Sequence, residues 1–297
     1  MKYKKFFSPL ILIVSLKLLI LQMKKLKIKR KIKVLNLKNL RKYKLNNNNI
    51  NIIDINYNQR QPFEKISSKS NHYIENSFKT ALSILKNKIS NKLVNGPISK
   101  KHFLKKNFLG VTEYLAKKTK IKSFAMLIYN KKLSVCPITT HLPIKLVPKN
   151  LNIKTIKNKI ILINNFYKDF FKRKPRIAVT GLNPHCESVL NKNEDFTIIR
   201  PAILALKSKR YDVKGPFSAD TIFLKKNRRE YDVIVGMYHD QVLSPIKTLY
   251  EYSAVNITLG LPFIRISPDH GPNEKMVGKN LSNPLSLIEA ITFLDKK

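Results

Sequence analysis

The sequence predicts an α/β layered fold, and two observations lead to this prediction. Apolar runs of strand length alternate with amphipathic segments of helical period along most of the chain. A chain of 297 residues with 43% hydrophobic residues is also long enough to bury one large or two modest cores. No internal repeat and no Pro- or Ser-rich linker divides it. We therefore expect a globular α/β protein.

The N-terminal segment has a basic start at residues 1–5 and a largely apolar run at residues 6–22. Such a pattern superficially imitates a signal peptide or a membrane anchor. However, Lys17 interrupts the run, the part before it is too short to cross a bilayer, and no small-residue cleavage site follows. We expect a buried strand over residues 9–15 that leads into a basic amphipathic helix.

The later elements are predicted from the spacing of their apolar residues. Residues 26–61 are rich in Lys and Asn, and residues 40–62 are expected to form a mobile insertion. An amphipathic helix is predicted over residues 74–92. Two strands, 124–129 and 133–139, are separated by a short polar turn typical of a hairpin. A strand at 176–180, a helix at 194–207, a strand at 231–237 and an apolar run at 255–261 follow.

The formal net charge of +40 would suit binding to nucleic acid or to an anionic membrane. The lysines, however, are spread from Lys2 to Lys297 and are accompanied throughout by Asn and Ile, which indicates compositional drift rather than one basic face. We expect no nucleic-acid and no membrane partner. The two cysteines, Cys136 and Cys186, have no paired spacing, which favours a reducing, cytoplasmic compartment.

Four of the six histidines lie just beyond the ends of predicted strands: His141, His185, His239 and His270. Ligands of open α/β sheets gather at the carboxyl ends of the strands. Neutral imidazoles bind divalent metals, and three of them leave coordination positions for a substrate oxygen. No short H-x-x-H spacing supports a metal site, and a single histidine is more often an ordinary surface or core residue.

Three kinds of charged residue accompany these histidines. Asp220 and Asp240 could orient an imidazole or accept a proton, although Asp220 follows a Gly-Pro turn and could simply cap a helix or face solvent. Lys247 is one cation among many. Arg265 stands in an apolar stretch, where a guanidinium needs an anionic partner such as a phosphate, a substrate carboxylate or a protein carboxylate.

Four sequence blocks resemble the 4-hydroxythreonine-4-phosphate dehydrogenase family. They are TTHLP at 139–143, GLNPH at 181–185, GMYHDQ at 236–241 and NITLGLPFIR at 256–265. The blocks occur in the order and spacing of that family, and the resemblance runs from about Leu93 to the C-terminus. It implies an isocitrate/isopropylmalate dehydrogenase-like fold with two α/β subdomains around a central cleft. The subdomains would comprise about residues 1–105 with 266–297, and about residues 106–265.

The resemblance also implies roles for individual residues. His141, His185 and His239 match the family's ligands for a divalent metal, which would be Zn, Mg or Co. Thr112, Lys247, Asn256 and Arg265 match its substrate contacts. Asp220, Asp240 and Lys247 are the candidates for proton handling and orientation. His270, Gly271 and Asn283 are the candidates for contact with NAD or NADP.

The activity that the resemblance implies is the oxidation of 4-phosphooxy-L-threonine by NAD or NADP. Loss of carbon dioxide then yields 3-amino-2-oxopropyl phosphate, a step of pyridoxine and pyridoxal phosphate biosynthesis. The metal would acidify the hydroxyl and polarise the ketone, and the nicotinamide would carry the hydride. The family pattern also implies a homodimer with a metal site shared between the subunits.

The sequence departs from the family pattern at four places. No Gly-x-Pro-Ala-Gly-Ile-Gly segment occurs between Met1 and Leu40, so the chain is expected to start one strand later than the family. Val111 stands where the family has His. Residues 186–189 stand where the family has a glycine-containing run. Residues 272–275 differ from the run that the family has on the cofactor side of its site. Two further hypotheses therefore stay open: an eroded, catalytically weak or inactive family member, and a basic nucleic-acid or membrane-surface binder.

Overall fold

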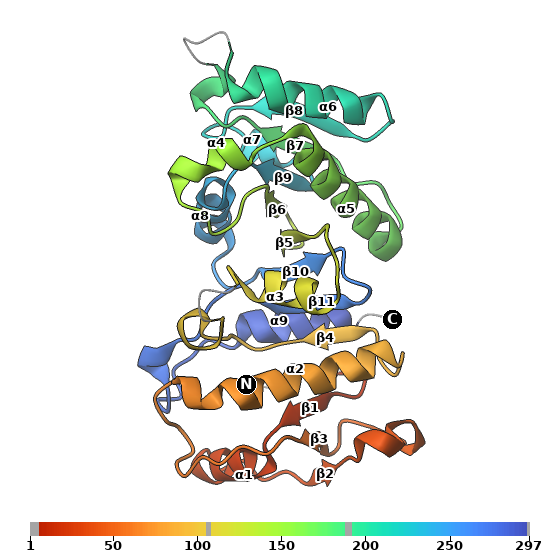
Figure 1. Cartoon of the computed structure of the whole chain (residues 1–297), viewed down its shortest axis with the longest axis vertical. Helices are drawn as coiled ribbons and strands as arrows, with labels where there is room; N and C mark the ends of the chain where they lie inside the picture. Colours follow the sequence, from red (N-terminus) through yellow and green to blue (C-terminus); the bar gives the residue numbers. More distant parts are fainter. Residues whose placement is uncertain (1–5, 105–107, 188–191, 296–297) are drawn as a thin grey trace. The chain divides into compact units, whose positions relative to one another are not determined.

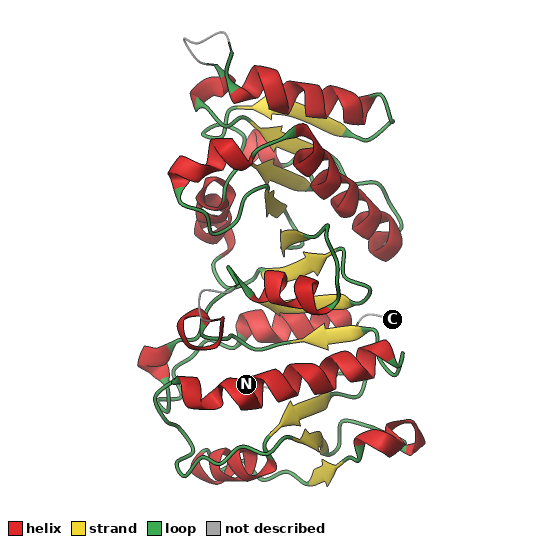
Figure 2. Cartoon of the chain, in the orientation of Figure 1, coloured by secondary structure: helices red, strands yellow, loops and turns green. Residues whose placement is uncertain are grey.

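The computed structural model describes residues 6–104, 108–187 and 192–295. The chain divides into two compact units: unit 1 comprises Met1–Asn107 and His270–Lys297, and unit 2 comprises Phe108–Asp269. Figure 1 labels the helices and strands of both units, and Figure 2 shows that each unit contains both helices and strands.

Unit 1 contains a three-stranded parallel sheet with the strand order β1-β3-β2. The strands of this sheet are β1 (Ile11–Val14), β2 (Ile32–Val34) and β3 (Ile50–Asp54), and unit 1 also contains β4 (Lys92–Val94). Its helices are α1 (Leu16–Lys25), α2 (Asn71–Lys86) and α9 (Leu285–Leu294), with short turns η1 (Leu37–Lys42), η2 (Ser68–Ser70), η3 (Lys100–Leu104) and η7 (Glu274–Met276). A cluster of buried Leu35, Leu40, Ile53 and Ile84 forms a core in this unit.

The predicted strand and basic helix at the N-terminal end are confirmed, but the strand is only partly buried, since the Leu12 side chain of β1 is 38% exposed. Strand β1 is followed by α1, where the Ser15 hydroxyl accepts a hydrogen bond of 3.3 Å from the Leu18 amide and so begins the helix. Lys24 and Lys25 lie in the last turn, where they stabilise the negative end of the helix dipole. Among the described residues, no helix has the length and hydropathy that crossing a bilayer requires.

The prediction of a mobile insertion over residues 40–62 is wrong. Strand β3 lies in this segment and occupies the middle of the three-stranded sheet. Ile52 is 0% exposed, and the side-chain Nδ2 of Asn51 donates hydrogen bonds to the carbonyls of Leu10 (3.1 Å) and Asn46 (2.7 Å). The asparagine-rich flanks concealed a short β-branched strand, and its burial between two neighbours outweighs the polar composition around it.

Unit 2 contains seven hydrogen-bonded strands in the order β11-β10-β5-β6-β9-β7-β8. Strands β6, β9, β7 and β8 run parallel to one another, whereas β5, β10 and β11 pair antiparallel. Their bounds are β5 (Ala125–Tyr129), β6 (Ser134–Pro137), β7 (Ile177–Thr180), β8 (Val213–Phe217), β9 (Val233–Gly236), β10 (Val255–Leu259) and β11 (Ile264–Pro268).

The helices of unit 2 flank this sheet (Figure 1). They are α3 (Val111–Lys118), α4 (Val147–Asn150), α5 (Ile153–Phe171), α6 (Arg200–Lys207), α7 (Lys225–Arg228) and α8 (His239–Tyr250), with short turns η4 (Ile144–Leu146), η5 (Pro184–Cys186) and η6 (Asp195–Ile199). Helix α8 packs against β6 and β9, and α5 packs against α6 and β5.

Most predicted elements of unit 2 are confirmed, since strands β5, β6, β7, β9 and β10 lie within the predicted ranges.

Two helices differ from the prediction. The helix predicted over residues 74–92 is α2 of unit 1, and it ends at Lys86, because Lys88 takes a left-handed conformation (φ 53°) and β4 follows. The 19-residue helix α5 was not predicted, although its buried Ile156, Ile160, Ile163 and Tyr167 recur at helical spacing.

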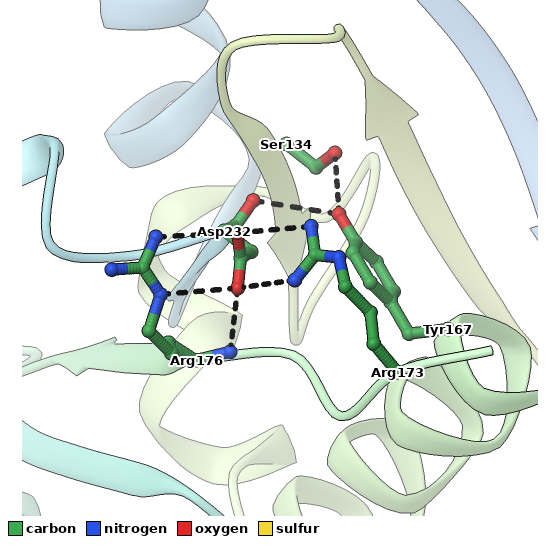
Figure 3. Close-up of polar contacts among 5 residues, drawn as sticks. All are labelled: Ser134, Tyr167, Arg173, Arg176 and Asp232. Atoms are coloured by element: carbon green, nitrogen blue, oxygen red, sulfur yellow. Dashed lines mark hydrogen bonds and ion pairs between the residues drawn. The ribbon is translucent and has the colours of Figure 1, made fainter. Parts of the chain in front are cut away.

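A polar network holds the amino ends of strands β6 and β9 in unit 2 (Figure 3). The Asp232 carboxylate accepts hydrogen bonds from the Arg173 guanidinium (2.9 and 3.1 Å) and from the Arg176 amide (2.8 Å). Partial burial by itself would raise the pKa of Asp232, but these hydrogen bonds outweigh it and lower the pKa. The Tyr167 and Ser134 hydroxyls lie 3.1 Å apart beside it. The opposite edge of the sheet carries the candidate site.

Candidate functional site at the carboxyl ends of the strands

The three candidate metal ligands follow three neighbouring parallel strands. His141 lies in the loop after β6, His239 begins α8 after β9, and His185 lies in the turn η5 after β7. Because β6 pairs with β9 and β9 pairs with β7 in parallel register, these side chains leave the same edge of the sheet. Asp220 follows β8, the next strand along, and belongs to the same edge.

The structure brings two of the three histidines together. The ring centroids of His141 and His239 lie 5.4 Å apart with an interplanar angle of 40°. His239 Nδ1 also lies 2.6 Å from Asp240 Oδ1, so this carboxylate orients the ring. Over the ranges 6–104, 108–187 and 192–295, no three His, Cys, Asp or Glu side chains are grouped so as to hold a metal ion.

His185 lies beside Asp220. The Ser218 hydroxyl donates a hydrogen bond of 2.5 Å to Asp220 Oδ1, and this bond together with the nearby His185 lowers the pKa of Asp220. Asp220 is exposed and is therefore an ionised carboxylate at neutral pH. Of the run that replaces the family's glycines after His185, Ser188 and Val189 lie outside the described residues.

Two of the candidate ligands have unusual backbone conformations. His141 (φ 53°) and His185 (φ 56°) both lie in the left-handed region, as does Cys186 (φ 58°). A non-glycine residue rarely adopts this conformation, and it persists only where the surroundings hold it. Other described residues, such as Lys88 and Lys172 at helix ends, share this conformation, so it orients the two side chains but does not by itself indicate a functional role.

Asp195 holds the loop that carries His185. Its fully buried carboxylate accepts hydrogen bonds from the Leu182 amide (2.8 Å), the Asn183 amide (3.1 Å) and the Asn183 side chain (2.8 Å). Gly181 is required here by space, because a Cβ would lie 2.7 Å from Asp195 Oδ1. The turn after β7 is therefore built around one buried carboxylate.

Gln241 ties the ends of β9 and β7 together. Its Oε1 accepts hydrogen bonds from the Met237 amide (2.7 Å) and the Thr180 hydroxyl (2.9 Å), and its Nε2 donates to the Gly181 carbonyl (2.8 Å). Thr139 makes a similar tie between β6 and β9, since its hydroxyl donates to the Met237 carbonyl at 2.8 Å. The loops that carry the histidines thus have a rigid base.

The candidate substrate residues Thr112 and Arg265 are connected through Thr258, which was not predicted. Arg265 on β11 lies opposite Thr258 on β10, and its Nη1 donates a hydrogen bond of 2.9 Å to the Thr258 hydroxyl. That hydroxyl lies 3.2 Å from the Thr112 hydroxyl on α3. Burial lowers the pKa of Arg265 to about 10, against the opposing influence of Glu113, so the guanidinium is charged at neutral pH.

Asn256 shares one face of β10 with Thr258, because side chains alternate along a strand. Its Oδ1 atom is buried and has no hydrogen-bond partner in the part of the chain that the structure describes. A buried polar atom of this kind is an expected contact for a ligand. Asn256 therefore fits a substrate-binding role.

Lys247 has a protein partner. Its ammonium forms an ion pair with the buried Asp269 carboxylate and donates a hydrogen bond of 3.1 Å to the Asp269 carbonyl. Part of its charge is therefore already balanced within unit 2. A substrate anion would have to share Lys247 with Asp269.

Glu113 is a further residue of this site, besides Thr258, that the sequence did not predict. It lies in the first turn of α3, its Oε1 accepts a hydrogen bond of 3.3 Å from the Thr140 hydroxyl, and its Oε2 is buried. It also counteracts the effect of burial on the pKa of Arg265 and of Lys159. The residue stands in the sequence directly after Thr112, but an acidic residue in a first helical turn ordinarily indicates only a favourable dipole interaction.

Lys159 is a second cation close to this edge, and it is partly buried. It projects from α5, and its ammonium donates hydrogen bonds to the carbonyls of Pro137 (3.3 Å) and Ile138 (2.7 Å) where β6 ends. Burial lowers its pKa, while Cys136 and Glu113 act in the opposite direction. Cys136 itself is an inert thiol, because burial raises its pKa to about 11.

The candidate cofactor residues His270, Gly271 and Asn283 lie in unit 1. His270 Nδ1 lies 3.0 Å from the Gly271 carbonyl, and a Cβ at Gly271 would meet nothing within 4 Å. The Asn283 side chain accepts a hydrogen bond of 2.9 Å from the Leu285 amide at the start of α9, which is a local structural role. Contact of these residues with a dinucleotide stays a prediction.

Fold and site together define an α/β protein that presents histidines and a buried arginine around one edge of its sheet. A model of the family described as "Pyridoxal phosphate biosynthetic protein PdxA" matches residues 6–294. The chain therefore belongs to this family.

Two relatives illustrate the range of names in this family. The 4-hydroxythreonine-4-phosphate dehydrogenase of Sulfurihydrogenibium sp. is 44% identical over 224 residues, which cover 74% of this chain and 67% of that protein. The D-threonate 4-phosphate dehydrogenase of Salmonella typhimurium is 41% identical over 182 residues, which cover 60% of this chain and 56% of that protein. The chain thus aligns with about two thirds or less of the length of these relatives.

Solved structures agree with the family. The crystal structure of 4-hydroxythreonine-4-phosphate dehydrogenase from Klebsiella pneumoniae matches with a TM-score of 0.83 at 29% identity, over 98% of this chain and 88% of that one. Isocitrate dehydrogenase from Methylococcus capsulatus matches with a TM-score of 0.50 at 10% identity, over 96% and 84%, which is a likeness of fold alone. The predicted isocitrate/isopropylmalate dehydrogenase-like α/β fold is confirmed.

Proposed function

We propose that this chain catalyses the oxidative decarboxylation of 4-phosphooxy-L-threonine to 3-amino-2-oxopropyl phosphate, with NAD or NADP as oxidant. The names of its relatives support a dehydrogenase of this kind. The observation that carries the proposal is the placement of His141, His239 and His185 after adjacent parallel strands, with the first two rings 5.4 Å apart. The family match does not favour the basic-binder or eroded-member hypotheses.

The histidines supply the kind of donor that a borderline divalent ion such as Zn or Co prefers, and Mg is the third candidate. In this proposal His141, His185 and His239 would hold the metal. When bound, the metal would polarise the substrate's C3 oxygen and the nicotinamide would accept the hydride from C3. His239 is oriented by Asp240 for such a role.

The side chains of unit 2 would bind and orient the substrate. Arg265 offers a charged guanidinium, with Thr112 connected to it through Thr258, so this pair would hold an anionic group of the substrate. Asn256 would donate or accept a hydrogen bond beside it. Lys247 would contact a second anionic group while it remains bound to Asp269. Fixing both ends of the substrate would align C3 for hydride transfer.

Two aspartates would handle the proton of the C3 hydroxyl. The lowered pKa of Asp220 keeps it ionised as an acceptor, and Asp240 is exposed beside His239. After hydride transfer, the β-keto acid loses its carboxylate as carbon dioxide, and a proton must return to C2. Lys247 is the candidate donor for this step.

We also propose a homodimer in which a second copy completes the metal site. The reason is that only two of the three histidines are adjacent within the described residues of one chain. His270, Gly271 and Asn283 would contact the dinucleotide, and the cytoplasm is the compartment that the cysteine content favours.

The test is turnover of the purified full chain. We expect formation of NADH or NADPH with 4-phosphooxy-L-threonine in the presence of a divalent metal, and loss of this activity on chelation. His239→Ala should abolish turnover, whereas His72→Ala, at an exposed histidine of unit 1, should not. D-threonate 4-phosphate serves as the competing substrate. Turnover that survives both chelation and His239→Ala would contradict the proposal, and no turnover with either substrate would favour the eroded-member hypothesis.

A further inference from the structure

The two carboxylate oxygens of Glu113 have different surroundings. Oε1 accepts a hydrogen bond of 3.3 Å from the Thr140 hydroxyl, in the residue before His141. Oε2 is buried, and no hydrogen bond reaches it from any residue that the structure describes. Leaving a carboxylate oxygen buried without a donor is costly, so a donor is expected at this point in the ligand-bound protein.

The imidazole of His141 lies on the side of Gly110 where this oxygen is found. A Cβ at Gly110 would lie 2.8 Å from Glu113 Oε2, 3.3 Å from His141 Cε1 and 3.6 Å from His141 Nδ1. The carboxylate and the imidazole therefore border the same small space. Gly110 has an extended backbone (φ −164°) that any residue adopts, so its importance is the absence of a side chain.

The neighbouring histidine already has a carboxylate on the corresponding nitrogen. His239 Nδ1 lies 2.6 Å from Asp240 Oδ1, and its ring centroid is 5.4 Å from that of His141. A carboxylate on Nδ1 selects the tautomer in which Nε2 carries the lone pair for a metal. Glu113 is placed to orient the ring of His141 in the same way that Asp240 orients the ring of His239.

We propose that Glu113 is a positioning residue whose Oε2 accepts a hydrogen bond from His141 Nδ1–H when Nε2 of this histidine binds a divalent metal. The inference rests on the proposed metal site. Two cations attract the Glu113 carboxylate: the buried Arg265 on the substrate side, and the partly buried Lys159 at the end of β6. Glu113 therefore connects the residue that would bind the substrate anion to a residue that would bind the metal.

The experiment measures metal binding without substrate or nucleotide. Metal-free full-length protein is titrated with Co²⁺ and followed by calorimetry and by the visible absorption of the bound ion. We expect Glu113→Gln to weaken Co²⁺ binding about 10- to 100-fold, the range found for carboxylates that orient metal-binding histidines. Glu230→Gln removes an equal charge from an exposed position of unit 2 and should leave the affinity unchanged.

A second measurement reports the hydrogen bond itself. In the Zn²⁺-loaded protein, the His141 Nδ1–H proton should be visible by NMR in the wild type and absent in Glu113→Gln, with His141→Gln used for assignment. If Glu113→Gln does not fold, Glu113→Asp, which keeps the charge but retracts it from the ring, should weaken Co²⁺ binding instead.

The outcomes separate this inference from the proposed function. Wild-type protein that binds Co²⁺ while Glu113→Gln binds it equally well would overturn the inference alone. A Glu113→Gln variant that loses substrate affinity but keeps Co²⁺ affinity would also overturn the inference, because Glu113 would then act on the substrate and not on His141. Wild-type protein that does not bind Co²⁺ at all would overturn the metal site and the inference together.

Discussion

The side chain of Gln241 accepts a hydrogen bond of 2.9 Å from the hydroxyl of Thr180, and so joins α8 to the end of β7. The same amide also contacts the Met237 amide and the Gly181 carbonyl. Thr180 and Gly181 precede His185, Met237 precedes His239, and Gln241 lies in the first turn of α8, which His239 begins. The relative placement of the two loops therefore depends on one glutamine.

Gln241→Ala should destabilise unit 2 by about 2–4 kcal/mol, because three hydrogen bonds are lost and the fully buried Thr180 hydroxyl is left without its acceptor. Urea unfolding measures this free energy. Gln61→Ala, at an exposed glutamine, should stay within about 0.5 kcal/mol of the wild type. Equal stability of the two variants would show that Gln241 does not hold the loops.

Arg265→Met should weaken substrate binding and also lower the stability of unit 2. Arg265 is 2% exposed, and the substitution removes its hydrogen bond to Thr258 and one of the cations that attract Glu113, which should cost about 1–3 kcal/mol. The KM for the phosphorylated substrate should rise about 10- to 100-fold, as expected when charge-assisted hydrogen bonds to an anion are lost. Arg229→Met, at an exposed position, is the control. A large loss of stability with unchanged KM would assign Arg265 to the core instead.

Asp232→Asn should lower the free energy of unfolding by about 1–3 kcal/mol at pH 7. The loss is limited because the Arg173 and Arg176 side chains are 53% and 51% exposed and the solvent screens their charges. Asp169→Asn, at an exposed aspartate of the same unit, should change stability little.

The same pair of variants gives a pH dependence. The pKa of Asp232 is lowered in the folded protein, so its stabilising effect is fully present above the ordinary value of 3.8 and is lost as the pH falls through the lowered value. The difference between wild type and Asp232→Asn should therefore be constant from pH 7 to about pH 5 and shrink below pH 3.8. A difference that grows on acidification would contradict this sign.

Gly110→Ala should disturb the candidate metal site without unfolding the protein. The added methyl group would lie 2.8 Å from Glu113 Oε2 and 3.3 Å from the His141 ring, so one of them must move. We expect Co²⁺ affinity to fall while the melting temperature changes little, since the extended backbone suits alanine. Gly96→Ala, where a Cβ meets nothing within 4 Å, is the matched control and should bind Co²⁺ as the wild type does.

Much of the secondary structure follows from local patterns in the sequence. The apolar runs at 124–129, 176–180 and 231–237 became strands because β-branched and apolar residues of strand length lie between polar turns. The positions of His141, His185 and His239 beyond strand ends also follow from these patterns. Local patterns mislead where strand-forming and loop-forming residues are mixed. At β3, the flanking asparagines indicated a loop although the segment between them is a strand.

The sequence alone determined the α/β class and, through four short blocks, the resemblance to a protein family. It also determined which residue types are available to bind a metal and an anion. Only the tertiary structure decided that β6, β9 and β7 are neighbours, that His141 and His239 meet, and that Arg265 reaches Thr112 through Thr258. It also decided that Glu113 and His141 both border Gly110. The physical reason is that strand pairing joins segments far apart in the chain, and burial then gives a side chain its partners, neither of which a local pattern records.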